Sequence, residues 1–400
     1  MRRSTWRYLV NLAFFGGALF LIIYLNGHHS DNKTFAWTTV RYKTTSITLP
    51  KARGTCPGLA DTSKPALVVS RVAADGDFKW LDALTDLYHL CIYTADAPVN
   101  THSTYLQVPA NRGHEAMAYL TFLIDNYADI PEAGVVFVHG ARWAWHNDWP
   151  DYDNKALLTA LNVSAALAPS GYHNLRCDWS AGMCFPSSAP PQGSLETAMS
   201  AMLEPWNARA ISDAALPHAL VALFGEDMSA TDLRSVANER ASVVGGRGSH
   251  LGRTDTVRAQ CCAQFAVARN RVWQHSRDEY VALRQWLLDG SSNNDVNERS
   301  KSRKTAPRDD RVAGRILSYL WHILFLQLDE SSAQKSSPGA YGSVDLERLN
   351  TLACPRADDC YCRLYGRCDL DGCEDSARCH GQYVLPPDLR LPADWVATHS

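Results

Sequence analysis

The sequence of 400 residues lacks an excess of charge of either sign. Its 39 Lys and Arg residues nearly balance its 42 Asp and Glu residues, and the formal net charge is -3. The basic residues are scattered along the chain and form no stripe. Because proteins bind nucleic acid through basic surfaces that neutralise phosphates, we expect no nucleic-acid partner. Apolar residues make up 46% of the chain, which is enough for one large or two modest globular domains.

Two common binding motifs are also missing. The glycines between residues 225 and 255 follow no apolar strand and precede no Gly-Lys-Ser/Thr triplet, so they predict no phosphate-binding loop. The twelve cysteines include no Cys-x2-Cys pair, which favours disulfides over zinc. We expect Cys177 to bridge Cys184, because six residues that include a turn-forming Gly182 separate them. Three further bridges, of unknown connectivity, are expected among Cys354, Cys360, Cys362, Cys368, Cys373 and Cys379.

The N-terminus carries a long, largely apolar run without charge, LVNLAFFGGALFLIIYL, at residues 9–25. As a helix this run is about 25 Å long, close to the hydrocarbon thickness of the endoplasmic reticulum membrane. Three arginines precede it, and the residues after it lack the small-x-small pattern of a signal-peptide cleavage site. The pattern therefore predicts an uncleaved signal anchor that binds the bilayer through residues 9–25, and a cleaved signal peptide is the alternative.

The charge asymmetry around this run predicts the topology. Arginines on the N-terminal side indicate a cytoplasmic tail and a luminal body, as in a type II protein of the endoplasmic reticulum or Golgi membrane. The even number of cysteines agrees with an oxidising compartment. Two triplets, at Asn32 and Asn162, are candidate N-glycosylation sites.

Downstream of residue 64 the pattern alternates between strands and helices. Residues 65–72, 89–95 and 134–140 resemble buried strands, and residues 111–131 and 155–167 have helical spacing of apolar side chains. This alternation predicts an α/β fold with a mostly parallel sheet flanked by helices. The expected organisation is a tail (1–8), an anchor (9–25), a stalk (26–64), an α/β domain (65–330) with polar insertions near 225–255 and 291–311, a Cys-rich segment (331–385) and a C-terminal tail (386–400).

The stretch VVFVHGARWAWHNDWPDYDN, at 135–154, concentrates reactive side chains after an expected strand. His139, His146 and Asp148 offer two nitrogens and a carboxylate for a divalent cation such as manganese. The alternative is that the histidines only form hydrogen bonds within the loop. Trp143 and Trp145 are candidates for stacking on sugars, with core packing as the alternative. The Asp-x-Asp pairs of the chain, at Asp75, Asp151 and Asp369, are no more frequent than chance allows.

A second candidate site is the expected helix start at residues 111–115. Free backbone amides and the helix dipole favour an anion such as phosphate there. Arg112 would add a charge-assisted contact. The alternative is that Asn111 caps the helix and Arg112 lies on the surface.

Several ordered motifs resemble a fungal family of single-pass membrane proteins catalogued as a domain of unknown function. They include LQVPANRGHEAMAYLTFLIDNY, VVFVHGARWAWHND, GYHNLRC, QFAVARNRV, YLWHILF and CPRADDCYCRLYGRC, within residues 65–370. That family is in turn similar to A-type nucleotide-sugar glycosyltransferases, whose Asn-x-Gly-Arg-Asp/Glu pattern resembles residues 111–115. His114 replaces the arginine of that pattern, and His139 stands where such enzymes place Asp-x-Asp.

This resemblance implies a glycosyltransferase that moves a sugar from a nucleotide sugar to a luminal glycan or glycoprotein. It implies Glu115 or Asp151 as the catalytic base. The residues implied for donor and phosphate binding are Asn111, Arg112, Gly113, His114, Arg142 and His322. A non-catalytic carbohydrate-binding or scaffold protein and a metal-dependent hydrolase stay open. Convergence of the 111–115 helix start, the His139 loop and His322 on one pocket would favour the transferase.

Overall fold

The protein is described by a computed structural model that covers most of the chain. The residues described are 3–26, 34–35, 37, 39–43, 54–96, 104–148, 152–168, 170–185, 187, 190–225, 251, 255–291, 305–326, 344–368, 370, 373, 376–377 and 379. The strands are β1 (Thr34–Phe35), β2 (Ala66–Arg71), β3 (His89–Thr94), β4 (Leu106–Gln107), β5 (Val135–His139), β6 (Tyr172–Asn174), β7 (Phe265–Val267) and β8 (Val344–Asp345).

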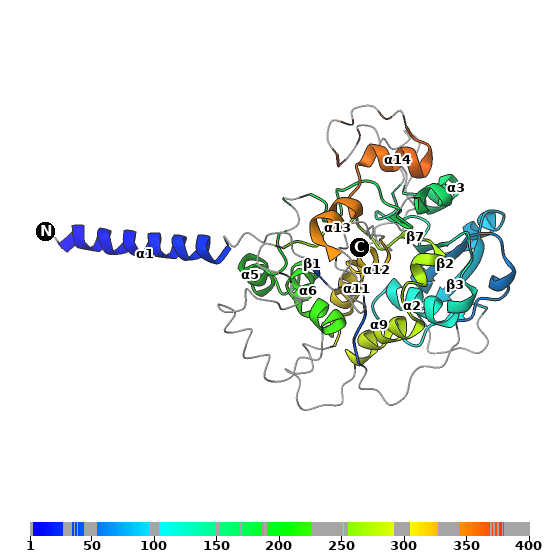
Figure 1. The fold of residues 1–400 in the computed structure, drawn as a ribbon, viewed down its shortest axis with the longest axis horizontal. Helices are drawn as coiled ribbons and strands as arrows, with labels where there is room; N and C mark the ends of the chain where they lie inside the picture. The colour runs from blue at the N-terminus through cyan, green and yellow to red at the C-terminus, as the bar shows by residue number, and fades with distance from the viewer. Residues whose placement is uncertain are drawn as a thin grey trace, which may run out of the picture.

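Helix α1 extends away from the rest of the described chain, and the other helices lie around the strands (Figure 1). The α-helices are α1 (Arg3–Asn26), α2 (Glu115–Asp125), α3 (Asn154–Ala160), α4 (Val163–Leu167), α5 (Leu195–Leu203), α6 (Ala208–Phe224), α8 (Arg269–Val272), α9 (Arg277–Asp289), α11 (Asp310–Ser318), α12 (Trp321–Phe325), α13 (Leu346–Ala353) and α14 (Ala357–Tyr365). Short 3-10 helices are η1 (Leu59–Asp61), η2 (Ala73–Asp75), η3 (Lys79–Leu84) and η4 (Tyr127–Asp129).

The central sheet has six strands in the order β4-β3-β2-β5-β7-β6. Strands β4, β3, β2 and β5 are parallel to one another, whereas β7 is antiparallel to both β5 and β6. The α/β class is confirmed and three of the five strand pairings are parallel, but the two antiparallel pairings of β7 were not expected and make the sheet mixed. The sequence pattern failed here because the apolar alternation that identifies a strand carries no information about its direction.

Side chains of the strands alternate between two cores, one on each face of the sheet. Val68, Phe137 and Phe265 face a core that also contains side chains of α2, α6, α9, α11 and α12. Val69 and Val138 face a second core with η3, α3, α4 and α14. Both faces are therefore covered, and ligands can approach the sheet only at its edges.

The predicted helices form with local differences. The run at 155–167 breaks into α3 and α4, because the Asn162 side chain accepts a hydrogen bond from the amide of Ala165 and starts a new helix. Asn162 is exposed, so its glycosylation stays a prediction, whereas Asn32 lies outside the described residues. Most of the two polar insertions, at 226–250 and 292–304, also lies outside them.

Helix α1 corrects the prediction of a membrane anchor. The helix itself forms, but no helix within the described ranges is both long and apolar enough to cross a membrane. Its uncharged stretch of residues 9–25 is at the short end of the range of about 17–25 residues with which helices cross a bilayer. Asn11, Gly16 and Gly17 also lower its apolar content. The predicted transmembrane helix is therefore wrong.

All twelve cysteines form disulfides, which confirms the eight that were predicted to do so. The pairing of Cys177 with Cys184 is wrong, because Cys177 bridges Cys360 and Cys184 bridges Cys354. These two bridges fasten the Cys-rich segment to the α/β domain. The remaining tail bridges are local, Cys362–Cys368 and Cys373–Cys379. Cys56–Cys91 and Cys261–Cys262 were not predicted.

Candidate functional site

The strand order reverses between β2 and β5. Strands β3 and β4 follow β2 on one side of the sheet, and the next parallel strand, β5, lies on the other side of β2. In open α/β sheets, ligands bind outside the carboxyl ends of the strands at such a switch point. Ser70 of β2 is in register with His139 of β5, so the loops that follow both strands begin side by side.

Gly140 allows these two loops to touch. A Cβ atom at this position would lie 2.8 Å from Cβ of Arg71 and 2.8 Å from Oδ2 of Asp75. Any larger residue would push Arg71 and Asp75 away. Arg71, Asp75 and His139, which we call the switch-point cluster, are thus held together by a glycine.

The guanidinium of Arg71 lies against two aromatic rings. Its guanidinium carbon lies 4.1 Å from the ring centroid of Phe78 and 4.5 Å from that of Tyr105. Such cation–π contacts fix the orientation of the side chain. The Nε atom of Arg71 is buried and has no hydrogen-bond partner among the described residues. The Nη2 atom of Arg71 donates to the carbonyl oxygen of Val72, at 3.5 Å, so Nε is a buried donor that the described residues leave unsatisfied.

Asp75 is the acidic member of the cluster. Its Oδ2 accepts a hydrogen bond of 2.8 Å from the amide of Val72. Burial raises the pKa of Asp75, and the nearby His139 and Arg71 oppose this rise. Asp96, which follows β3, accepts a hydrogen bond from the amide of Ala73 in the same loop. The one carboxylate of the cluster thus has a second, that of Asp96, in its vicinity.

His139 is held from two sides. Its Nε2 lies 2.8 Å from the carbonyl oxygen of Cys262, and its backbone amide donates to Oε1 of Gln264. The buried Gln264 also bonds the side chains of Asn147 and Asn154, at 3.0 Å and 3.2 Å. This amide network fixes the loop after β5 against the segment before β7.

The residues of the loop after β5 that were predicted to bind a ligand differ in their contacts and exposure. The ring centroids of His139 and His146 are 4.2 Å apart, and Trp145 packs edge-on against His146 at 5.4 Å. Trp145 is 50% exposed, as sugar stacking requires. Arg142 instead forms two hydrogen bonds with Asp153 and lies over the ring of Trp143. Asp151 lies outside the described residues.

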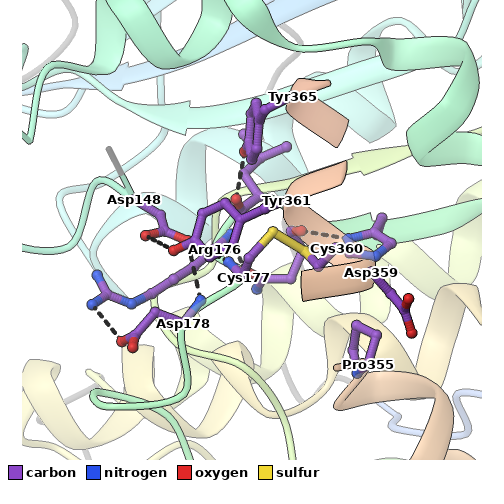
Figure 2. Close-up of a disulfide and its surroundings, with 12 residues drawn as sticks. Asp148, Arg176, Cys177, Asp178, Pro355, Asp359, Cys360, Tyr361 and Tyr365 are labelled. Carbon is purple, nitrogen blue, oxygen red and sulfur yellow. Dashed lines mark hydrogen bonds and ion pairs between the residues drawn. A yellow bond between two sulfur atoms is a disulfide. The ribbon is translucent and has the colours of Figure 1, made fainter. Parts of the chain in front are cut away.

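Asp148 stabilises the loop (Figure 2). It is 2% exposed, and its carboxylate accepts hydrogen bonds from the amides of Cys177 and Asp178 and from the hydroxyl of Tyr361. Burial raises the pKa of Asp148, and Arg176 opposes the rise. Both carboxylate oxygens are thus already bonded by the protein beside the Cys177–Cys360 bridge.

The residues present do not fit the predicted divalent cation. His139, His146 and Asp148 do not form a ligand group with atoms within 4.8 Å of one another. The single such group found in the described part of the chain is Cys56, His89 and Cys91. Its two sulfur atoms are bonded to each other as a disulfide, and metal binding requires thiolates.

The predicted phosphate site at the start of α2 is filled by the protein. The buried guanidinium of Arg112 donates to the carbonyl oxygens of Leu287, Pro307 and Arg308 and to Oδ1 of Asp310, at 3.1 Å. The same Oδ1 lies 2.5 Å from the amide nitrogen of Gly113. Asp310 is therefore the anion at this helix start.

The neighbouring predicted residues lie around this pair. Asn111 is exposed and is not the cap of α2, a position held by His114. The His114 ring lies 3.8 Å from the carboxylate of Asp310, and Glu115 is half-buried in the first turn. None of the described contacts joins these residues to the switch-point cluster.

No contact among the described residues joins the side chain of His322 to either cluster. Its side chain on α12 is 1% exposed, and neither ring nitrogen has a hydrogen-bond partner among the described residues. Burial lowers the pKa of His322 to about 3, so the ring is neutral at physiological pH. The site residues implied for one pocket are therefore not brought together there by any described contact.

Sequence reasoning missed most of the switch-point cluster. Asp75 was predicted as part of an Asp-x-Asp pair of chance frequency after the first strand, with a solvated loop carboxylate as the favoured alternative, and Arg71 was not predicted. Arg71 ends the first strand of an alternating pattern and Asp75 lies in the loop after it, which is the one available signal. Cys262 and Gln264 had no such signal, because tertiary folding brings them to His139 across more than 120 residues.

Comparison with known proteins agrees with the resemblance to a family of unknown function. A family model described as "Protein of unknown function (DUF3431)" matches residues 67–363. The match includes most of the sheet, both polar clusters and the Cys177–Cys360 bridge. No curated protein and no solved structure matches the chain. The chain therefore belongs to the DUF3431 family of proteins of unknown function.

Proposed function

We propose that this protein is a glycosyltransferase that binds its nucleotide-sugar donor at the switch point between β2 and β5. The observation that carries the proposal is the switch-point cluster itself. A guanidinium with a buried donor and a nearby carboxylate lie where the strand order reverses. This is the position at which open α/β sheets bind nucleotides.

Each member of the cluster has a chemical task in this proposal. Arg71 neutralises the diphosphate, because a guanidinium donates two parallel hydrogen bonds to phosphate oxygens. Asp75 and Asp96 accept hydrogen bonds from ribose hydroxyls, as acidic residues do in dinucleotide-binding sheets. Glu115 and Asp151 remain the bases implied by the sequence resemblance, and we assign no step to either.

A second function, carbohydrate binding without catalysis, is favoured by one observation. Arg112 and Asp148, two charged groups implied for donor or metal binding, are saturated by internal hydrogen bonds. A binding protein needs the exposed Trp145 but does not need a converged acid, base and metal. A measurement of sugar transfer therefore distinguishes the glycosyltransferase from the non-catalytic binding protein.

The test is a titration of the full chain with UDP-sugars and GDP-sugars, with and without manganese, followed by its thermal midpoint. A ligand at one hundred times its Kd stabilises the folded state by about 2.7 kcal/mol, which is a readily measured shift. We expect Arg71→Ala to weaken binding at least tenfold. Arg311→Ala is the matched control, because Arg311 is exposed and pairs with Asp309 alone among the described contacts.

Release of nucleoside diphosphate in the presence of mixed glycan acceptors then tests transfer. Donor binding with release supports the glycosyltransferase. Glycan binding with no donor binding and no release would replace it with the carbohydrate-binding function. Absence of any shift with either ligand class would overturn both.

A further inference from the structure

Two adjacent cysteines form a disulfide beside the switch-point cluster. Cys261 and Cys262 are bonded to each other, so one small ring contains both side chains and the peptide bond between them. Both residues are partly exposed, and they lie just before β7. Neither the proposed donor contacts nor the sequence motifs give this ring a role.

The backbone at this ring adopts an unusual conformation. Cys262 and Ala263 have φ values of 92° and 49°, a region that non-glycine residues rarely occupy. Strained backbone of this kind persists where the surroundings hold it and is concentrated at functional sites. Here it directs the carbonyl oxygen of Cys262 to Nε2 of His139, 2.8 Å away. The ring is thereby joined to the site.

A row of contacts extends from the ring along the loop after β5. Cys262 contacts His139, the His139 ring packs against His146, and the His146 ring packs against Trp145. We call the surface of Cys261, Cys262, His139, His146 and Trp145 the shelf. Its two ends are the disulfide ring and the half-exposed Trp145 ring.

The chemistry of the two ends indicates what the shelf binds. A disulfide and an indole both offer polarisable surface with few hydrogen-bond donors. One face of a pyranose consists largely of C–H bonds, which such surfaces contact favourably. His139 lies between the two ends of the shelf and also belongs to the switch-point cluster. A ligand with its diphosphate at Arg71 could therefore extend a sugar onto the shelf.

We propose that the shelf is a sugar subsite that binds the apolar face of a pyranose ring, with the Cys261–Cys262 disulfide as one of its contact surfaces. The proposal rests on the proposed function for the placement of the diphosphate. The pyranose is either the sugar of the donor or a sugar of the acceptor, because both present the same C–H face.

The test compares three probes on the full chain by calorimetry: uridine diphosphate, UDP-glucose and the free disaccharide cellobiose, with GDP and GDP-mannose as a second pair. In the Cys261→Ala/Cys262→Ala variant, we expect the affinity for the nucleotide sugar to fall at least tenfold. The affinity for the nucleoside diphosphate should change less than twofold. The Cys362→Ala/Cys368→Ala variant removes another local disulfide and should leave both affinities unchanged.

Trp145→Ala is the second variant, because Trp145 is half exposed and its loss should leave the fold intact. We expect it to reproduce the selective loss of sugar affinity. Loss confined to nucleotide sugars identifies the donor sugar, and loss confined to cellobiose identifies the acceptor. Equal affinities in wild type and both variants, or equal losses for the diphosphate and the nucleotide sugar, would overturn the proposal.

Failure of the proposed function gives a different result. If the wild type binds cellobiose but no nucleotide, and the variants lose cellobiose, the donor site is refuted and the shelf stands. If the wild type binds none of the probes, both proposals are refuted.

Discussion

The switch-point cluster and the start of α2 both present an arginine and an aspartate, but their environments are opposite. At the start of α2, the guanidinium of Arg112 donates to three carbonyl oxygens and to Asp310. In the switch-point cluster, Arg71 has a buried Nε without a partner among the described residues. The pKa of Asp75 is raised there by burial. One cluster is closed by the protein, whereas the other keeps groups that a ligand can satisfy.

This difference shows that a sequence motif can predict an anion site without predicting which anion occupies it. A helix start with an arginine favours an anion whether the anion is a phosphate or a carboxylate of the same chain. Asp310 lies almost 200 residues after Arg112 in the sequence, and only the fold brings them together. The closed cluster should therefore affect stability, and the open cluster should affect binding.

The largest effect is expected for Arg112→Ala. The substitution leaves three carbonyl oxygens and the carboxylate of Asp310 without their donor, so the free energy of unfolding should fall by about 3–4 kcal/mol. Urea denaturation measures the loss, and Arg311→Ala, an exposed pair, should change it by less than about 1 kcal/mol. Nucleotide-sugar binding by the folded fraction should persist. A variant that is as stable as the wild type but no longer binds nucleotide sugar would instead support the predicted phosphate site at the start of α2.

Asp148→Asn should have the next largest effect. Asparagine keeps the shape but turns an amide nitrogen toward the donors that now bond the carboxylate, which costs about 2–3 kcal/mol. Asp359→Asn, at an exposed position next to Cys360, is the control and should cost less than about 0.5 kcal/mol. Manganese-dependent stabilisation of the wild type that Asp148→Asn abolishes would instead make Asp148 a metal ligand.

His322→Leu should change the pH dependence of stability. Burial lowers the pKa of His322 to about 3, below the ordinary value of 6.5. The unfolded chain therefore binds a proton below pH 6.5 that the folded protein does not, and stability falls as the pH decreases. We therefore compare the free energy of unfolding of the leucine variant with that of the wild type at each pH. This difference should shift in favour of the variant by about 2 kcal/mol when the pH is lowered from 7 to 5.

Measurement at two pH values provides the control. A packing defect caused by leucine would change the free energy of unfolding equally at pH 5 and pH 7. Chemical denaturation at pH 5 and pH 7 gives the difference. An equal effect at both pH values, together with loss of nucleotide binding, would support His322 as a diphosphate contact.

Asp75→Asn should have the smallest effect on stability. The folded pKa of Asp75 is raised, so its favourable contribution is present at acidic pH and is lost as the pH rises through that pKa. The neutral amide can still accept the hydrogen bond from Val72, so the variant should gain about 0.5 kcal/mol or less at pH 7. Thermal unfolding measures this gain. A large decrease in stability would contradict this expectation and would show that Asp75, like Arg112 and Asp310, mainly stabilises the fold.

The sequence predicted local elements well and long-range partners poorly. The expected strands at 65–72, 89–95 and 134–140 match β2, β3 and β5 to within one or two residues, because apolar alternation is a local property. The cap of α2 was wrong at Asn111, and the pairing of Cys177 was wrong. In both cases the deciding partner, Asp310 or Cys360, is distant in the sequence.

By itself, the sequence determined that this is an α/β domain rich in disulfides, and that His139 ends a strand at the carboxyl edge of its sheet. Only the tertiary structure decided that β7 runs antiparallel, that Asp310 fills the start of α2 and that Cys262 meets His139. The physical reason is the distance along the sequence over which each effect acts. Backbone propensity and apolar periodicity act over a few residues, whereas charge satisfaction and disulfide geometry depend on which segments the packed core brings into contact.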